Sequence, residues 1–232
     1  MKFETTVKEI IQRTHDVQSF RFDKLDSFDY KAGQFMWITI KDNGNKLRKH
    51  FSFSSSPTEK NFVEFTKKLS DSDFSKALRK LKVGDWAEID GPFGKFTFEG
   101  EHKKIGMLSG GIGITPLISI CRYCTDKSLD TKITLLYGNR TPEDIVFRQE
   151  LEEMQNKNTN MKVVLSIDRA SEGWTSRVGF IDSDLIKNEI PDYMDTVFYT
   201  CGPPKMVEIM TKILKDLGLP ETHIKIENFA GY

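Results

Sequence analysis

The chain has 232 residues, and 34 lysines and arginines balance 34 aspartates and glutamates, so the formal net charge is zero. Dedicated nucleic-acid-binding proteins and polybasic membrane-surface proteins normally carry a basic excess, so the charge balance argues against both classes. No stretch approaches the roughly 18 apolar residues of a membrane-spanning helix, and no signal peptide is recognisable. Three cysteines fit a reducing compartment better than a disulfide framework. We expect a soluble cytoplasmic protein of one large or two ordinary domains.

The first hundred residues are rich in phenylalanine and are predicted to form short strands separated by turns. The sequence DNGN at 42–45 predicts a hairpin turn with Gly44 at positive φ. One amphipathic helix is expected over 73–81. The predicted strands named from the pattern are 17–22, 34–40, 51–55, 61–66 and 86–89. Closely spaced strands with a single helix predict a small six-stranded antiparallel β-barrel.

After Gly100 short apolar runs alternate with helical patterns, which predicts parallel βαβ units. The expected strands are 104–108, 133–137, 162–167, 196–200 and 223–226, and the expected helices lie near 116–124, 144–154 and 204–217. A charged stretch at 99–103 separates the two patterns. We therefore place a barrel domain over residues 1–100 and an α/β domain with a parallel sheet over residues 101–232.

The segment 110–116 reads GGIGITP and lies between a predicted strand and a predicted helix. Glycine amides at a helix N-terminus can cradle a phosphate, because the N–H groups point outward and no side chain blocks the approach. The segment lacks the third glycine of the ordinary dinucleotide fingerprint, and the acidic residue about twenty positions later is missing as well. A standard dehydrogenase fold is disfavoured, which leaves another pyrophosphate-binding domain or a tight structural turn.

Three further segments could carry chemistry, and each also has a structural explanation. The run RKHFSFSSSP at 48–57 could bind a planar anion, or it could be an amphipathic strand followed by a serine-rich turn. The start of the helix at 72–76 could bind phosphate, or Ser72 or Asp73 could simply cap it. The sequence TCGPP at 200–204 places a cysteine at a strand end, either near a ligand or as a buried thiol.

The pair Cys121 and Cys124 has C-x-x-C spacing but sits inside a predicted apolar helix. The third cysteine and the four histidines lie in unrelated segments. We expect the pair to pack in the core, and we expect neither a metal site nor an iron–sulfur cluster.

Taken in order, these segments resemble the ferredoxin–NADP⁺ reductase superfamily of flavin-dependent reductases, and the resemblance covers essentially the whole chain. The family motifs are R-x-Y-S-x-S-S on a strand, a helix-start motif, G-x-G-x-[TA]-P and C-G-P-P. The resemblance implies that the barrel binds FAD and that the α/β domain binds NADH or NADPH. Lysine and phenylalanine stand where arginine and tyrosine are usual in the strand motif.

On the flavin side, the resemblance implies that Phe51 packs against the isoalloxazine and that Ser52 lies near flavin N5. Lys49 occupies the position of the arginine that binds the FAD diphosphate, and Arg48 is the alternative. The implied flavin-binding set is completed by His50, Phe53, Ser54, Phe65 and Lys67, and by the backbone amides of Ser75 and Lys76.

On the nucleotide side, Cys201 matches the family cysteine close to the hydride path, and Glu227 is a candidate for the carboxylate near it. Tyr232 resembles an aromatic residue that covers the flavin in relatives, although a frayed tail is the alternative. With Ser52 these three residues form the implied catalytic set. The implied nucleotide-binding residues are Gly111, Gly113, Ile114, Thr115, Pro116, Arg140, Gly202 and Pro203, together with Cys201.

The resemblance implies an FAD-dependent enzyme that accepts hydride from NAD(P)H at flavin N5 and passes electrons to a separate protein or small molecule. Three alternatives stay open: a flavin reductase that uses diffusible flavin, an electron-transfer subunit active only on a partner enzyme, and a non-catalytic nucleotide sensor. The segment 166–169 offers Ser166 and Arg169, with Arg177 later, but Ile167 and Asp168 do not suit a 2′-phosphate. We therefore expect NADH to be favoured over NADPH, with an acceptor that the sequence does not identify.

Overall fold

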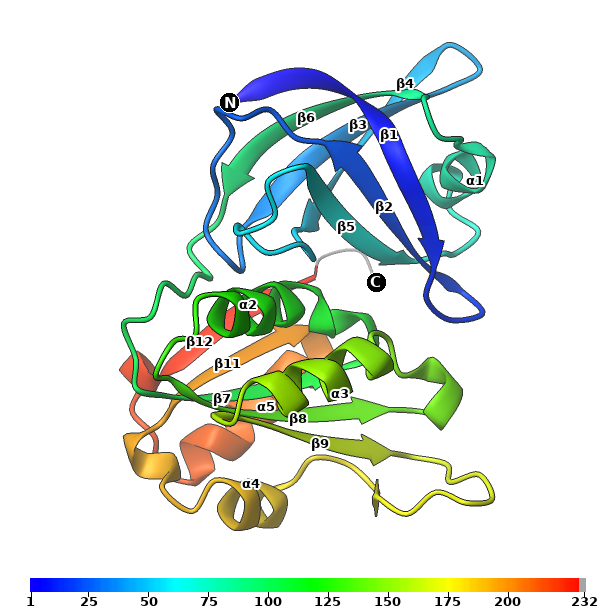
Figure 1. The fold of residues 1–232 in the computed structure, drawn as a ribbon. Coiled ribbons are helices and arrows are strands. Elements are labelled where there is room, and N and C mark those ends of the chain that lie inside the picture. Colours follow the sequence, from blue (N-terminus) through cyan, green and yellow to red (C-terminus); the bar gives the residue numbers. More distant parts are fainter. Residues whose placement is uncertain (230–232) are drawn as a thin grey trace.

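The computed structural model describes residues 1–229, which form a β-barrel domain above an α/β domain (Figure 1). The barrel is a curled antiparallel sheet in the order β4-β3-β6-β1-β2-β5, so β4 and β5 are its edge strands. Its elements are β1 Lys2–Gln12, β2 Val17–Asp23, β3 Phe35–Asp42, β4 Asn45–Ser52, β5 Phe62–Lys68, α1 Asp73–Lys80 and β6 Trp86–Phe93. The six strands and the single helix confirm the predicted first domain.

Two strands of the barrel differ from the expectation. The strand β1 was not located in the sequence, because Val7 is its one fully buried residue and polar residues fill most of it. The strand β4 begins at Asn45 rather than at Phe51, and it ends at Ser52. The DNGN turn is confirmed, since Asp42 pairs with Asn45 and the two residues between them have positive φ. Positive φ at both central residues is typical of the tight turn that suits the twist of a hairpin.

The phenylalanines of the first half explain the barrel core. Phe20, Phe53 and Phe65 have no exposed surface, and Phe20 stacks on Phe65 with ring centroids 5.2 Å apart. The ring of Phe53 stacks on Tyr30 at 4.0 Å. The helix α1 buries Phe74 and its neighbours against this core. Burial of such rings supplies most of the driving force for a small barrel.

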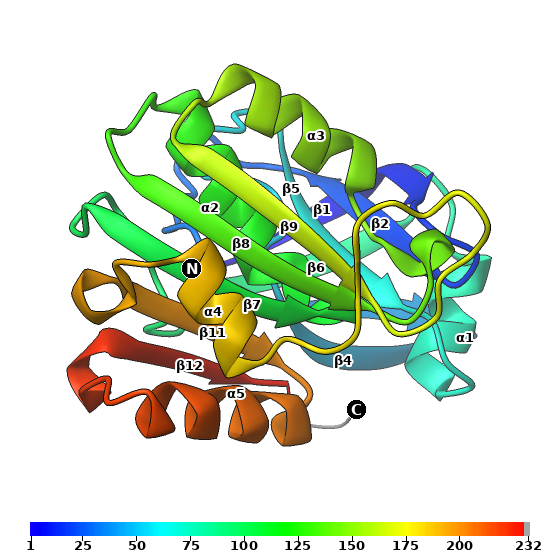
Figure 2. The same cartoon turned by 90° about the horizontal axis from the view of Figure 1, so that it is seen from below.

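The second domain is a parallel sheet in the order β10-β9-β8-β7-β11-β12. Helices α2 and α3 cover the face toward the barrel, and α4 and α5 cover the other face (Figures 1 and 2). The strands are β7 Lys104–Gly110, β8 Lys132–Asn139, β9 Met161–Ile167, β10 Arg177–Val178, β11 Val197–Gly202 and β12 Ile224–Asn228; the helices are α2 Thr115–Asp126, α3 Arg148–Lys157, α4 Ser183–Glu189 and α5 Pro204–Asp216. The predicted α/β domain with a parallel sheet is confirmed.

Smaller differences concern short or interrupted elements. The short strand β10 and the helix α4 carried no clear pattern in the sequence. The helix expected over 144–154 begins only at Arg148, because Phe147 adopts a left-handed φ of 61° just before it. Cys121 and Cys124 are buried free thiols on α2, as expected for core packing.

The order in which strands are added to the parallel sheet reverses at β7. Strand β8 lies on one side of β7 and β11 lies on the other, so the crossovers leave in opposite directions. Ligands of open parallel sheets bind outside the carboxyl ends of the strands at such a switch point. Gly110 and Gly202 end the two strands that meet there.

The core on the α2 and α3 face continues into the barrel domain. Ala32, Phe96 and Phe98 of the first half pack in the same cluster as Ile105 and Leu117 of the second. The Tyr199 hydroxyl donates to the backbone carbonyl of Thr97 at 3.1 Å. The two halves are therefore joined by a continuous interior as well as by the chain.

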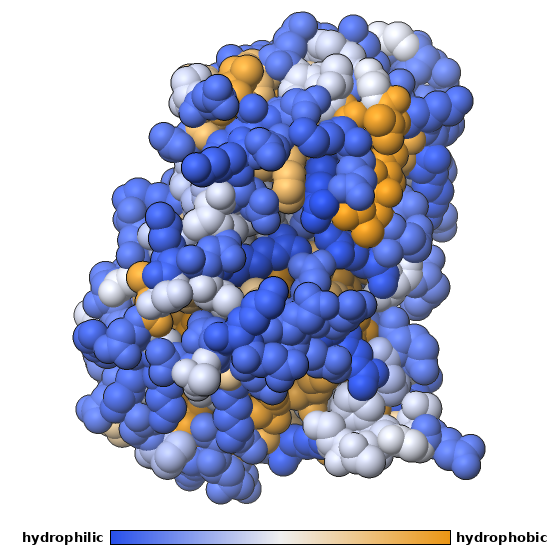
Figure 3. All heavy atoms as spheres, viewed as in Figure 1, coloured by the Kyte–Doolittle hydropathy of each residue, from blue (hydrophilic) through white to orange (hydrophobic). Residues whose placement is uncertain are grey.

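Hydrophilic residues dominate the face of the molecule shown in Figure 3, which is interrupted by an apolar patch on the barrel domain. Within residues 1–229 no helix combines the length and the apolar character that crossing a bilayer requires.

Candidate functional site

A pocket lies at the open seam between the edge strands β4 and β5, and we call it the seam pocket. Its volume is about 370 Å³. The barrel supplies most of its wall, and the α/β domain supplies Thr115, the end of β12 and Phe229. The lining residues are Phe35, Trp37, Arg48, Lys49, His50, Phe51, Ser52, Thr66, Lys67, Thr115, Glu227, Asn228 and Phe229. Aromatic rings and cations together suit a planar ligand that carries phosphate.

One wall of the seam pocket is aromatic and positively charged. The ring of Phe51 stacks on Phe65 at 4.5 Å, and the Lys67 Nζ lies 5.8 Å from the Phe51 ring centroid. Lys67 is only 5% exposed, and burial, with a smaller contribution from Lys49, lowers the pKa of Lys67 to about 8. An anion bound beside these two lysines would stabilise their charged forms.

The structure distinguishes Arg48 from Lys49. Arg48 donates to the Asp90 carboxylate at 2.7 Å, and its guanidinium lies 4.7 Å from the Trp37 ring. Lys49 forms no ion pair or side-chain hydrogen bond within the described part of the chain. Because the charge of Arg48 is already compensated, Lys49 is the better candidate to bind the FAD diphosphate.

Several residues of the implied flavin set lie elsewhere. Phe53, Ser54 and Phe65 have no exposed surface, so they support the pocket from inside the barrel and do not line it. The Ser75 amide donates to the Ser72 hydroxyl, and the Lys76 amide donates to the Ser72 carbonyl at 2.9 Å. Both amides are thus engaged at the start of helix α1, as the capping alternative expects, and their contact with a diphosphate stays a prediction.

The implied catalytic residues Ser52, Cys201 and Glu227 come together where the domains meet. Cys201 and Glu227 are direct neighbours on β11 and β12, and Ser52 and Glu227 both line the seam pocket. Burial raises the pKa of Glu227 to about 7, although the Ser52 hydroxyl favours its charged form. The Glu227 Oε2 atom is buried and has no hydrogen-bond partner among residues 1–229. A carboxyl in this state can bind or release a proton near neutral pH. Tyr232 lies outside the described residues.

The thiol of Cys201 is not a nucleophile in this arrangement. It is fully buried and donates to the Gly113 carbonyl at 2.9 Å. Burial, followed by the nearby Glu227 carboxylate, raises the pKa of this thiol well above its usual value. An un-ionised thiol in contact with the glycine-rich loop acts through packing, because nucleophilic attack requires the thiolate.

A second pocket lies at the carboxyl ends of β7, β8, β9 and β11, and we call it the switch-point pocket. Ser109, one residue before the end of β7, and Asn139, at the end of β8, have buried side-chain polar atoms without a partner within residues 1–229. Unpaired buried polar groups are costly, so a ligand with hydrogen-bonding hydroxyls or an amide fits here. The lining residues are Asp16, Val17, Lys68, Ser109, Gly110, Gly111, Ile112, Gly138, Asn139, Arg140, Asp144, Val146, Asp168, Gly179, Phe180, Ile181, Pro203, Met206 and Met210.

The glycine-rich segment serves both pockets. Gly111 lines the switch-point pocket and has a left-handed φ of 52°. A Cβ at Gly113 would collide with the Cys201 carbonyl oxygen, so glycine there lets the two loops touch. Of the other implied nucleotide residues, Arg140 and Pro203 line the switch-point pocket and Thr115 lines the seam pocket. Ile114 and Pro116 are buried beside the loop, Cys201 is enclosed, and Gly202 turns the chain at a φ of 142°.

The barrel also contributes to the switch-point pocket, which was not predicted from the sequence. Asp16, Val17 and Lys68 line it from the first domain. Lys67 and Lys68 are consecutive on β5, and successive side chains of a strand point to opposite faces. One lysine therefore reaches each pocket, and this alternation is a signal that the sequence contained. Trp37, Thr66 and Asn228 were also missed, because only the fold brings them to the seam.

The two pockets, one aromatic and cationic and one at a switch point, define a two-domain flavin and nicotinamide-nucleotide oxidoreductase. Family models agree: the Oxidoreductase FAD-binding domain matches residues 4–98, and the Oxidoreductase NAD-binding domain matches residues 107–212. NADH-cytochrome b5 reductase 1 of Dictyostelium discoideum is 32% identical over 96% of this chain and 80% of its own length. The glycine betaine monooxygenase reductase subunit of Chromohalobacter salexigens is 30% identical over 96% of this chain, which spans 63% of that protein.

Solved structures show the same architecture. The cytochrome b5 reductase domain of Ulva prolifera nitrate reductase superposes with a TM-score of 0.85 at 27% identity, over 98% of this chain and 97% of that one. The chain belongs to the ferredoxin–NADP⁺ reductase superfamily, in its two-domain form like cytochrome b5 reductase. It is a flavoprotein reductase that takes electrons from NAD(P)H and passes them to a separate acceptor.

The residues of the seam pocket fit FAD. When bound, FAD supplies the hydride acceptor and the store of electrons. Phe51 would hold the ring system, and Lys49 and Lys67 would neutralise phosphate. Ser52 and Glu227 would lie at the meeting of the domains, where a nicotinamide from the switch-point pocket arrives. Hydride transfer needs no general base, so the role expected of these residues is to orient the flavin and the nicotinamide.

The buried carboxyl of Glu227 makes stability depend on pH. Its pKa falls from about 7 to its ordinary value near 4.5 on unfolding, so stability decreases as the pH rises through that window. The Glu227→Gln variant should lose this part of the dependence and gain about 2 kcal/mol relative to the parent between about pH 5 and about pH 8. Denaturant unfolding at the two pH values measures the difference. The exposed Glu208→Gln substitution is the control, and an equal pH dependence in parent and E227Q would contradict the assignment.

The assignment of the diphosphate to Lys49 is tested by comparing Lys49→Met with Arg48→Met. Loss of a charge-assisted hydrogen bond should weaken FAD binding by about tenfold or more in K49M, and by less than about threefold in R48M. Fluorescence titration of the FAD-free protein gives both dissociation constants. Riboflavin, which carries no phosphate, should bind the parent and K49M alike; a larger loss in R48M would reverse the assignment.

Proposed function

We propose that this reductase uses NADH in preference to NADPH and delivers electrons to a separate one-electron protein acceptor of the cytochrome b5 kind. The observation that carries the coenzyme preference is the position of Asp168 in the switch-point pocket. The acceptor is supported by the relatives, since NADH-cytochrome b5 reductases of D. discoideum and Mortierella alpina are 32% and 34% identical to this chain.

Asp168 directly follows β9, and its amide donates to the Asn139 carbonyl at 3.0 Å. This hydrogen bond holds the residue in the wall of the switch-point pocket, which Arg140 also lines. A carboxylate can accept hydrogen bonds from the hydroxyls of a ribose, and it repels a 2′-phosphate. The charge of Asp168 therefore favours NADH.

The side chains of 166–177 that could bind a 2′-phosphate either form hydrogen bonds within the protein or lie outside the switch-point pocket. Ser166 is fully buried and donates its hydroxyl to the Gly179 carbonyl. Arg177 donates to the Asp182 carboxylate at 2.6 Å. Arg169 does not line the switch-point pocket. The cations that line this pocket, Lys68 and Arg140, lie outside this segment, and a 2′-phosphate bound there would still meet the charge of Asp168, which supports NADH.

The coenzyme preference is tested by Asp168→Ser. The parent should show a kcat/KM for NADH at least about 100-fold above that for NADPH, and removal of the repelling charge should reduce this ratio by about tenfold or more. Steady-state kinetics with both coenzymes gives the ratio. Asp184→Ser, an exposed position on α4, is the control. A parent that prefers NADPH, or an unchanged ratio in D168S, would contradict the proposal.

The acceptor is tested with purified, yellow enzyme under anaerobic conditions. NADH should bleach the flavin, and oxidised cytochrome b5 should be reduced at a rate well above that of free FAD or FMN. Loss of flavin on dialysis, with free flavin as the best acceptor, would instead show a flavin reductase. Activity that appears only after a monooxygenase partner is added would show a docking subunit.

A further inference from the structure

A fully buried carboxylate lies at the boundary between the domains. Glu64, on β5, has no exposed surface, and both of its carboxylate oxygens accept hydrogen bonds from cations. Its Oε2 accepts from Arg13 at 3.1 Å and from Arg21 at 2.9 Å, and its Oε1 accepts from Arg122 at 3.2 Å. These arginines hold the pKa of Glu64 below its ordinary value in spite of its burial. The carboxylate is therefore charged and fully compensated.

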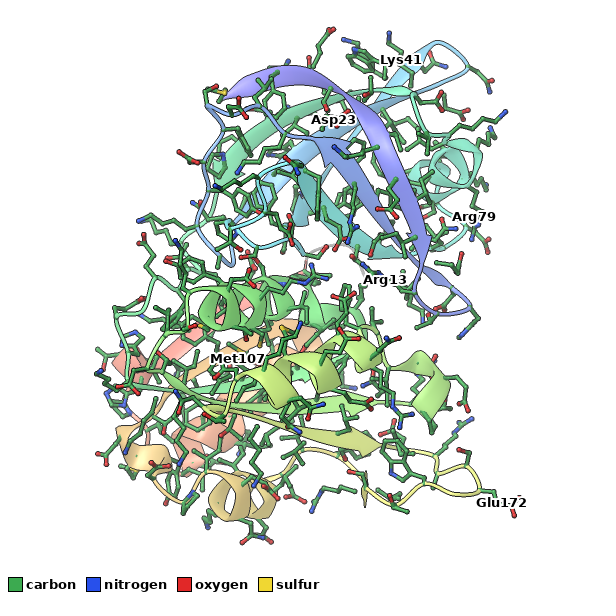
Figure 4. All side chains as sticks on the ribbon, viewed as in Figure 1. Arg13, Asp23, Lys41, Arg79, Met107 and Glu172 are labelled. Atoms are coloured by element: carbon green, nitrogen blue, oxygen red, sulfur yellow. The ribbon has the colours of Figure 1, made fainter. Side chains whose placement is uncertain are left out.

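Two of the arginines connect this carboxylate to a second one on the other domain. Glu150, on α3, accepts from Arg13 at 2.5 Å and also accepts from Arg122. Arg13 belongs to the barrel and Arg122 to α2, and Figure 4 shows Arg13 where the two domains face each other. Both guanidinium groups also lie over the ring of Phe147, at 4.8 and 5.2 Å. We call Arg13, Glu64, Arg122 and Glu150 the interdomain clamp.

Helix α2, which carries Arg122 of the clamp, forms hydrogen bonds with the backbone of the segment that follows Ser52. Arg122 donates to the Ser54 carbonyl, and Ser119 of the same helix donates to the Ser55 carbonyl at 2.6 Å. Thr115, Ser119 and Arg122 are spaced i, i+4 and i+7, so they share one face of α2. The first of these residues lines the seam pocket, and the last belongs to the clamp.

We propose that the interdomain clamp positions helix α2 on the segment after Ser52 and thereby sets the distance between the nicotinamide and the flavin for hydride transfer. The proposal rests on the proposed function, because it concerns hydride transfer from NADH to the flavin. It assigns these residues to positioning and not to contact with either ligand. Helix α2 begins at the glycine-rich loop, so a shift of the helix moves the nucleotide relative to the seam pocket. A misplacement of about 1 Å can slow a reaction by about 100-fold even when it originates far from the reacting atoms.

The test is anaerobic single-turnover reduction of the FAD-loaded enzyme by NADH, comparing the parent with Glu150→Gln. Glutamine cannot accept from both guanidinium groups and places an N–H donor against one of them. The limiting rate of flavin reduction should fall by about tenfold or more, while the dissociation constant of NADH stays within about twofold. FAD content, measured on the same samples, should match that of the parent, whereas the thermal midpoint should fall because two largely buried guanidinium groups lose a charged partner. Glu153→Gln, exposed on the same helix, should behave like the parent.

A second variant, Arg122→Lys, keeps the charge but loses the planar fork that reaches Glu64, Glu150 and the Ser54 carbonyl at once. It should slow flavin reduction at least as much as E150Q. The primary isotope effect with 4-deuterated NADH should remain fully expressed in both variants, because the hydride step itself is slowed.

Three results would contradict the proposed role of the interdomain clamp. The first is a rate of flavin reduction within about twofold of that of E153Q in both variants. The second is a loss confined to NADH affinity, and the third is a loss of FAD from variants that remain folded. Failure of the proposed function is distinguishable, since the parent itself would then not be reduced by NADH.

Discussion

The architecture depends on a gap, the seam where the curled sheet of the barrel stays open between its edge strands β4 and β5. A sheet that closed there would pair Ser52 and its neighbours with the end of β5 and leave no room for a ligand. Unpaired edge strands normally invite other chains to add to the sheet. In this protein the second domain covers part of the gap with Thr115, the end of β12 and Phe229. The seam pocket therefore lies where the two domains meet.

Although the net charge of the chain is zero, charged side chains are concentrated at particular places in the structure. Lys49 and the buried Lys67 make the seam positive, whereas Glu227 adds a carboxyl that titrates near neutrality at the boundary of the domains. Between the domains, three arginines meet Glu64 and Glu150, and Arg21 reaches Glu9 at 2.8 Å on the surface. Three cations and three carboxylates thus cancel within one cluster. Buried networks of this kind contribute less to net stability than to the choice of one arrangement over its alternatives.

Much of the fold was predictable because local patterns carry it. Alternating apolar residues, the DNGN turn and the glycine-rich loop located most strands and the order of the domains. The strand β1 escaped because its residues are largely polar and half exposed, so hydropathy carries no signal there. In the site, motif order led to Ser52, Glu227 and Gly111, which do line the pockets or the meeting of the domains.

What could not be predicted depends on contacts between distant segments. Phe53 and Phe65 belong to aromatic motifs but are fully buried inside the barrel. Lys68 and Asp16 reach the nucleotide pocket only because the barrel packs against the α/β sheet. Glu64 and Arg122 form an ion pair although they lie 58 positions apart in the sequence, and neither residue belongs to a recognised motif.

The continuous interior across residues 96–105 bears on how such enzymes can be recombined. A charged linker at 99–103 looks like a place to exchange one nucleotide domain for another, and Phe96 and Phe98 lie just before it. Both side chains are packed among residues of the second half, and the face of α2 is matched to carbonyl groups after β4. A chimera joined at the linker would therefore inherit mismatched surfaces on both sides of the seam. The unit that can be exchanged is the nucleotide domain together with the barrel residues that contact it. The boundary between the two packed cores therefore does not coincide with the linker at 99–103.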